Sequence, residues 1–133
     1  MANSASLNSG KTELITENDN IRIRHVYETK VGGVTLDVTD FPDATIESGH
    51  LVIFNSTTGV YKPMPITGTP LAYGSLPSGF AYFGFVIATV LKSSPFVGVV
   101  TRGSVNPAAF KYPITSIASA VKTALPHITF VED

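Results

Sequence analysis

Short apolar segments separated by turn residues dominate this chain and limit the folds that it can form. Its 133 residues include 11 glycines and 9 prolines, which leave no room for a long helix before the last third of the sequence. The apolar runs between these residues have the length and the alternation of β-strands. The sequence therefore predicts a β-dominated α+β fold, a small barrel- or sandwich-like domain with one or two short helices near the C-terminus.

Several segments carry the alternation or the apolar run that is typical of strands. In the first of them, Ile21–Tyr27, every second side chain shares one face, which is the period of a strand. Gly84 lies within a longer apolar run and marks a bulge or a close approach of another strand. The strands predicted in this way are Ile21–Tyr27, Val34–Val38, Leu51–Phe54, Val60–Lys62, Phe80–Leu91, Phe96–Thr101 and His127–Val131.

Turn residues organise the middle of the chain. Residues 55–59, with the sequence Asn-Ser-Thr-Thr-Gly, predict a hairpin turn between two of these strands. The closely spaced prolines and glycines of residues 63–79 predict an irregular loop, because each proline removes a hydrogen-bond donor from a β ladder.

Helical signals are confined to the end of the chain. Asn106 is a good N-cap and Pro107 suits the first helical position, so a helical turn is predicted over Ala108–Tyr112. A second helix is predicted over Ile117–Leu125, whose apolar residues fall on one face, and Pro126 ends it.

The chain has the length of a single domain preceded by a short arm. Met1–Asn20 is rich in Ser, Asn, Thr and Glu and contains few large apolar residues, so we expect a flexible N-terminal arm. Residues 21–133 are then expected to form one β-rich domain. The start of the sequence lacks the basic and apolar regions of a secretion signal.

Charge is scarce and unevenly distributed. Charged residues make up 14% of the chain, against about 25% in an ordinary soluble domain, so part of the surface is expected to meet another protein. A well-filled monomeric β-barrel is the alternative. Residues 1–50 hold eight acids and four bases, whereas residues 51–131 hold five bases and no acid. Five scattered bases do not form the clustered patch of a nucleic-acid interface.

The sequence offers no constellation for catalysis, a cofactor or a metal. There is no cysteine, and the three histidines lie in separate segments without a second ligand at a metal-binding spacing. No serine lies in a nucleophile elbow, and the acids Asp37, Asp40 and Asp43 lack the pattern of a calcium loop. The longest apolar run has twelve residues and is too short to cross a membrane. We therefore expect a non-enzymatic protein without cofactors.

A ligand-binding β module is the alternative function. Tyr61, Tyr73 and Tyr82 are the aromatic residues that could stack on a carbohydrate.

The order of features in the last two-thirds of the chain resembles a known family. The strand Leu51–Phe54 with its hairpin turn, the apolar strand 84–90, the block Val99–Phe110, a small helix and the final strand His127–Val131 follow one another. This order resembles the head-decoration proteins of tailed bacteriophages, typified by the lambda decoration protein, and is similar to phage head-fibre proteins. The region before Glu47 is longer than in the lambda type.

The resemblance implies a structural virion protein without enzymatic activity. Members of this family form homotrimers that bind the major capsid protein on the outside of the expanded head and stabilise it. By this likeness the protein would be made in the cytoplasm of the bacterial host and would reside on the capsid exterior, with no nucleic-acid or membrane partner. The arm and the first strand would provide the attachment, through Ile21, Arg22, Ile23, Arg24 and Tyr27.

Overall fold

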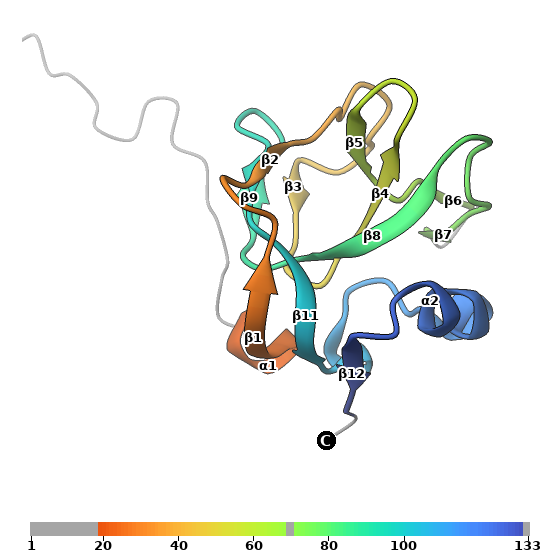
Figure 1. Cartoon of the computed structure of the whole chain (residues 1–133). Helices are drawn as coiled ribbons and strands as arrows, with labels where there is room; N and C mark the ends of the chain where they lie inside the picture. The colour runs from red at the N-terminus through yellow and green to blue at the C-terminus, as the bar shows by residue number, and fades with distance from the viewer. Residues whose placement is uncertain (1–18, 69–70, 132–133) are drawn as a thin grey trace, which may run out of the picture.

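The structure, a computed structural model, describes residues 19–68 and 71–131, and its main feature is one six-stranded sheet (Figure 1). Five strands run in the order β1-β11-β8-β4-β5, and every neighbouring pair is antiparallel. The last strand, β12, pairs in parallel with β11, which also pairs with β1 and β8. The strands are β1 (Ile23–Thr29), β4 (Leu51–Asn55), β5 (Val60–Pro63), β8 (Ala81–Val86), β11 (Val99–Val105) and β12 (Ile128–Phe130).

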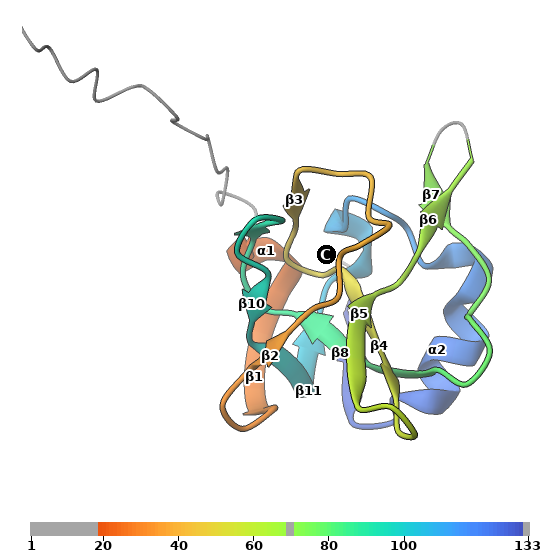
Figure 2. The same cartoon turned by 90° about the horizontal axis from the view of Figure 1, so that it is seen from above.

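Three small two-stranded ribbons and four helical segments complete the described part of the chain (Figure 2). The ribbons pair β2 (Val34–Thr35) with β10 (Phe96–Val97), β3 (Thr45–Ile46) with β9 (Val90–Leu91), and β6 (Ile66–Thr67) with β7 (Ala72–Tyr73). The helical segments are α1 (Asp19–Arg22), the 3-10 turns η1 (Pro107–Ala109) and η2 (Thr115–Ile117), and α2 (Ala118–Ala124). The predicted β-dominated fold with short helices near the C-terminus is thereby confirmed.

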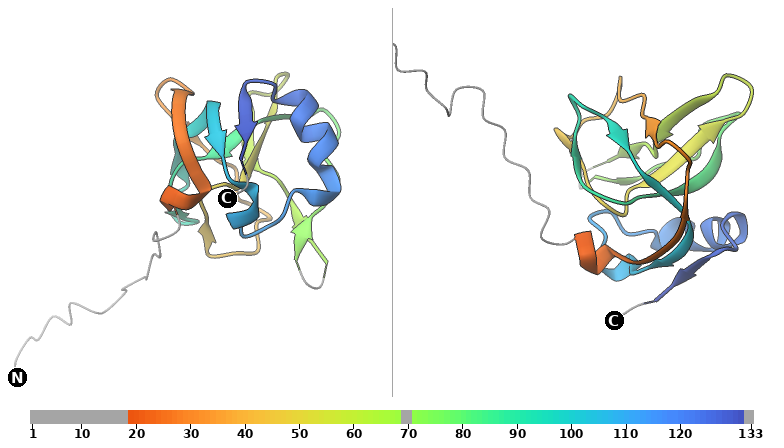
Figure 3. Two further views of the ribbon diagram at one scale, coloured as in Figure 1. Left: turned by 90° about the horizontal axis from the view of Figure 1, so that it is seen from below. Right: turned by 60° about the vertical axis from the view of Figure 1, so that its left-hand side comes forward.

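The main sheet does not close into a barrel. Within the described residues, the terminal strands β1 and β5 pair with one neighbour each and not with one another. Both therefore present a backbone edge on which the main sheet places no further strand. The sheet curves around a core while remaining open, as the two views in Figure 3 show.

The core lies between the middle of this sheet and the ribbons and helices packed against it. In β4, the consecutive residues Leu51, Val52 and Ile53 are all fully buried, because elements cover both faces of this central strand. That arrangement explains why β4 reads as a continuous apolar run rather than as an alternation. Helix α2 adds Val121 from one side.

Gly84 lies where β8 passes closest to β11. A Cβ atom added at this residue would come within 2.3 Å of the carbonyl oxygen of Val100. The pairing of β8 with β4 also shifts register next to Gly84: Val52 lies opposite Gly84, whereas the next residue of β4, Ile53, lies opposite Tyr82. A shift of this kind is typical of a β-bulge. Both predicted roles of this glycine, a close approach and a bulge, are confirmed.

Two predicted strands are shorter or divided in the structure. The run Phe80–Leu91 forms β8 and β9 in different sheets, because the chain leaves the main sheet after Val86 to pair with β3. The strand predicted over Val34–Val38 ends at Thr35, and the Asp37 carboxylate then accepts hydrogen bonds from the backbone and hydroxyl of Thr39.

The loop predicted over residues 63–79 contains the hairpin of β6 and β7. Pro63 and Pro65 lie outside the paired positions of this hairpin, so their missing donors do not interrupt it. The predicted strand Phe96–Thr101 is likewise divided into β10 and β11, and β11 continues to Val105.

The C-terminal predictions hold closely. The Asn106 side chain accepts a hydrogen bond from the backbone of Ala108 and caps η1, a turn that ends at Ala109 rather than at Tyr112. Helix α2 is one residue shorter at each end than predicted. The final strand spans Ile128–Phe130.

Candidate functional site

Strand β1 is the most exposed strand of the main sheet. Its first residue, Ile23, is buried, whereas every following residue through Thr29 is exposed, so the strand is exposed on both faces. One backbone edge pairs with β11, and no other described strand pairs with the opposite edge. Figure 3 shows β1 at the margin of the molecule beside β11. A strand in this position is accessible to another protein on three sides.

The pairing of β1 with β11 is irregular. The register steps over Arg24 and Tyr27, and a further shift follows Glu28. Bulges of this kind twist a strand and interrupt the regular row of donors and acceptors along its edge. The outer edge of β1 therefore does not offer a uniform ladder to a partner, and side chains must contribute to any binding there.

Large apolar side chains are exposed along β1, on the turn that follows it and on the neighbouring β10. Tyr27 is 65% exposed and Val26 39%, while Val31 in the turn is 88% exposed and Phe96 on β10 60%. The turn lies against β10, because a Cβ added at Gly33 would be 3.0 Å from the Phe96 ring. We refer to Val26, Tyr27, Val31 and Phe96 as the β1 surface.

The structure divides the five predicted partner-binding residues. Ile21 is half exposed on α1, and Arg24 and Tyr27 are exposed on β1. Arg22 and Ile23 are only 6% and 8% exposed, so little of either side chain is accessible to a partner in this structure. The predicted start of the strand at Ile21 is wrong, because residues 19–22 form α1 and the strand begins at Ile23.

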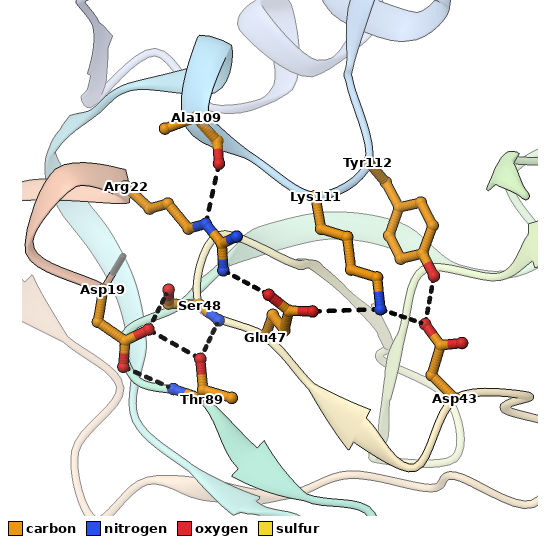
Figure 4. A network of polar contacts seen from close by, with 9 residues as sticks. All are labelled: Asp19, Arg22, Asp43, Glu47, Ser48, Thr89, Ala109, Lys111 and Tyr112. Carbon is orange, nitrogen blue, oxygen red and sulfur yellow. Dashed lines mark hydrogen bonds and ion pairs between the residues drawn. The ribbon is translucent and has the colours of Figure 1, made fainter. Parts of the chain in front are cut away.

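Arg22 is buried because it belongs to a polar network that fastens α1 to the domain (Figure 4). Its Nη1 atom donates to Glu47 Oε1 at 2.7 Å, and its Nε atom donates to the carbonyl oxygen of Ala109 at 2.9 Å. Lys111 joins the same Glu47 at 3.1 Å and Asp43 at 3.3 Å. A buried guanidinium with these partners is satisfied, and it is unavailable to a second protein.

Asp19 holds the other side of α1. Its carboxylate accepts hydrogen bonds from the hydroxyl of Ser48 at 2.6 Å and from the hydroxyl and backbone of Thr89 at 2.8 and 3.0 Å. These contacts explain why Asp19 and Asn20, predicted to belong to the flexible arm, form a helix with Ile21 and Arg22. The rest of the predicted arm, residues 1–18, lies outside the described residues.

The electrostatics of this network fit a structural role. Burial raises the pKa of Tyr112 to about 12, and its hydroxyl donates to Asp43. Partial burial lowers the pKa of Lys111, but the hydrogen bonds to Glu47 and Asp43 outweigh this and raise it overall. The pocket beside these residues has no space for a water-sized ligand. The network thus fixes α1 and supplies no open site for a substrate.

Replacing Arg22 by lysine is expected to lower the free energy of unfolding by about 1–2 kcal/mol. A lysine ammonium can reach Glu47 or the carbonyl of Ala109 but cannot reproduce the fork that bonds to both. Urea unfolding followed by circular dichroism measures the change. The same substitution at the exposed Arg102 is the matched control. Equal stabilities of the two variants would contradict the assigned role of Arg22.

The three tyrosines considered for carbohydrate stacking do not form a common platform. Tyr61 stacks on Phe54 with ring centroids 4.4 Å apart, and Tyr73 is buried with its hydroxyl accepting from the backbone of Leu51. Tyr82 lines a separate groove beside α2. The grouping of these residues in one site was therefore wrong.

Within residues 19–68 and 71–131, no group of three His, Cys, Asp or Glu side chains is placed to hold a metal ion. Among the same residues, no helix has the length and apolarity needed to cross a membrane. In comparisons with protein-family models, curated proteins and solved structures, no match to this chain was found.

Val26, Val31 and Phe96 are the members of the β1 surface that are absent from the five predicted residues, although Val26 lies within the predicted strand. Val31 precedes Gly32-Gly33, and an apolar residue at a glycine turn was a signal that could have identified it. Phe96 carried no such signal, because an aromatic residue at the start of a strand usually enters the core.

Proposed function

We propose that this protein is a structural virion protein that binds the outer surface of a phage capsid as a trimer and stabilises the expanded head. The observation that carries the proposal is the β1 surface, an exposed strand with apolar side chains at the edge of an open sheet. The order of predicted strands, glycine positions and short helices after Glu47 resembles the head-decoration family, and it supports the major capsid protein as the partner.

The attachment is made by side chains more than by backbone pairing. The bulges at Arg24 and Tyr27 interrupt the edge of β1, so a capsid strand could pair with it only over a short distance. The exposed apolar residues Tyr27, Val31 and Phe96 provide the surface that becomes buried on the shell. A trimer presents three such surfaces, and their tethering gives stable attachment although each contact is small.

The proposal predicts that the double variant Tyr27→Ser, Val31→Ser binds phage heads at least about tenfold more weakly, a loss of about 1.4 kcal/mol. Both side chains are exposed, so the fold should remain intact. Co-sedimentation of the full chain with DNA-free expanded heads measures the affinity. Leu71→Ser, an exposed apolar residue on the hairpin of β6 and β7, is the matched control and should bind normally.

Point substitutions suit this test better than deletion of the N-terminal region. Removing the chain through Tyr27 would also remove Asp19, Arg22 and most of β1, which fasten the sheet. Unchanged binding by the double variant would refute the role of the β1 surface. A monomeric mass in light scattering would refute the trimer, and failure of the unmodified protein to bind any head would refute the capsid function itself.

A further inference from the structure

A groove of about 660 Å³ lies between α2 and β8, on the opposite side of the molecule from β1 (Figure 1). One wall is formed by Phe80 and Tyr82, both half-buried. The other wall is the outer face of η2 and α2, where Ser116, Ser119 and Thr123 follow one another at helical spacing. A volume of this size is in the range of small-molecule sites in proteins.

Among the residues that the structure describes, no charged side chain lines this groove. The ammonium of Lys62 lies 5.6 Å from the centre of the Phe80 ring, and this cation is already engaged by the ring. The chain also has no acid between residues 51 and 131, so no carboxylate from these segments faces the groove. Because a charged ligand would lose its hydration without gaining a counter-charge, a neutral ligand fits this site.

The polar groups of the groove are hydroxyls. Those of Ser116, Ser119 and Tyr82 have no hydrogen-bond partner among the described residues, so each can both donate and accept. The Thr123 hydroxyl donates to the carbonyl oxygen of Ser119 at 2.9 Å and keeps only its acceptor capacity. Ala120 and Ala124 directly follow Ser119 and Thr123 on α2, and their small side chains leave the groove open.

We propose that this groove binds a short neutral glycan of roughly two or three sugar rings. A sugar ring has an apolar C–H face that packs on Phe80 and Tyr82, and hydroxyls that match those of Ser116 and Ser119 in donating and accepting. A purely apolar occupant, such as a partner helix or a second copy, would leave the same hydroxyls buried and unpaired. This binding site is separate from the proposed capsid attachment.

The test uses the full chain and a panel of neutral trisaccharides: maltotriose, cellotriose and triacetylchitotriose. Two-dimensional NMR titration should give saturable shifts for at least one of them, centred on Tyr82, Ser116 and Ser119. The variant Ser119→Arg places a large charged side chain on the exposed groove wall and should weaken that binding about tenfold or more. Thr115→Arg, an exposed residue lining the cavity on the other side of α2, is the control and should bind within about twofold of the unmodified protein.

Three results would overturn the inference. The first is the absence of saturable shifts with all three sugars, and the second is equal binding by the Ser119 and Thr115 variants. The third is self-association of the unmodified protein in sedimentation that Ser119→Arg abolishes, since a second copy would then occupy the groove. The first two outcomes leave the binding of heads by the β1 surface unchanged, so the two proposals can fail independently. The third would place a contact of the proposed trimer at the groove, and it would overturn glycan binding without refuting the capsid function.

Discussion

Replacing Gly103 by alanine is expected to lower the free energy of unfolding by about 3 kcal/mol or more. A Cβ atom at this position would lie 2.2 Å from the carbonyl oxygen of His25, and backbone atoms cannot move aside as a flexible side chain does. Strand β1 would have to separate from β11 at the middle of their pairing, where Val26 lies opposite Gly103. Urea unfolding at pH 7 measures the loss.

Gly98→Ala is the matched control for this prediction. The added methyl group would meet only the side chain of Ile87, at 3.2 Å from its terminal carbon, and that side chain can shift. We therefore expect a change of less than about 1 kcal/mol. Hydrogen exchange adds a local readout, because Gly103→Ala should reduce protection of the β1 amides first. Similar midpoints of urea unfolding for Gly103→Ala and Gly98→Ala would show that the close approach at Gly103 does not hold β1 against β11.

Stability is expected to fall by about 3 kcal/mol as the pH decreases from 6.5 to 4, owing to His50. Burial lowers the pKa of His50 to about 4, although its bond to the carbonyl oxygen of Met64 at 2.9 Å and the nearby Asp43 act in the opposite direction. The unfolded chain takes up this proton near pH 6.5, so it binds more protons than the folded chain in this interval. The stability is therefore highest above pH 6.5, and its loss levels off below pH 4.

Replacing His50 by glutamine should remove this pH dependence. The glutamine amide can still donate to the carbonyl oxygen of Met64, but it does not titrate. The stability of the variant protein should therefore vary less between pH 6.5 and 4. The same substitution at the exposed His127 is the matched control. Thermal unfolding at several pH values compares the three proteins. A slope that survives His50→Gln would assign the effect to other groups.

Elements defined by local chemistry were predictable from the sequence. The hairpin of β4 and β5, the Asn106 cap and helix α2 each depend on residues close together in the chain, and each was found within a few residues of its predicted place. The close approach at Gly84 was also identified. Gly103 lies within β11, which extends to Val105, beyond the end of the predicted strand Phe96–Thr101.

Features that depend on distant contacts were not predictable in this way. Ile21 and Arg22 continue the alternation of a strand, yet the bonds from Asp19 to Ser48 and Thr89 and from Arg22 to Glu47 hold them in a helix. The same bonds bury Arg22, so little of its side chain is accessible. Likewise, the division of the run Phe80–Leu91 follows from the pairing of β9 with β3, a segment that carries little signal of its own.

The attachment of α1 also determines how the domain responds to mechanical load. A pull on the chain ahead of Asp19 reaches the domain first through one carboxylate, which is bonded to both Ser48 and Thr89. Arg22 then transmits the remaining load to Glu47 and to the backbone of Ala109. Because these bonds end on segments far apart in the sequence, the force is distributed over several parts of the core before β1 can be peeled from the sheet. Separation of β1 from the N-terminal side therefore requires the bonds of Asp19 and Arg22 to break first.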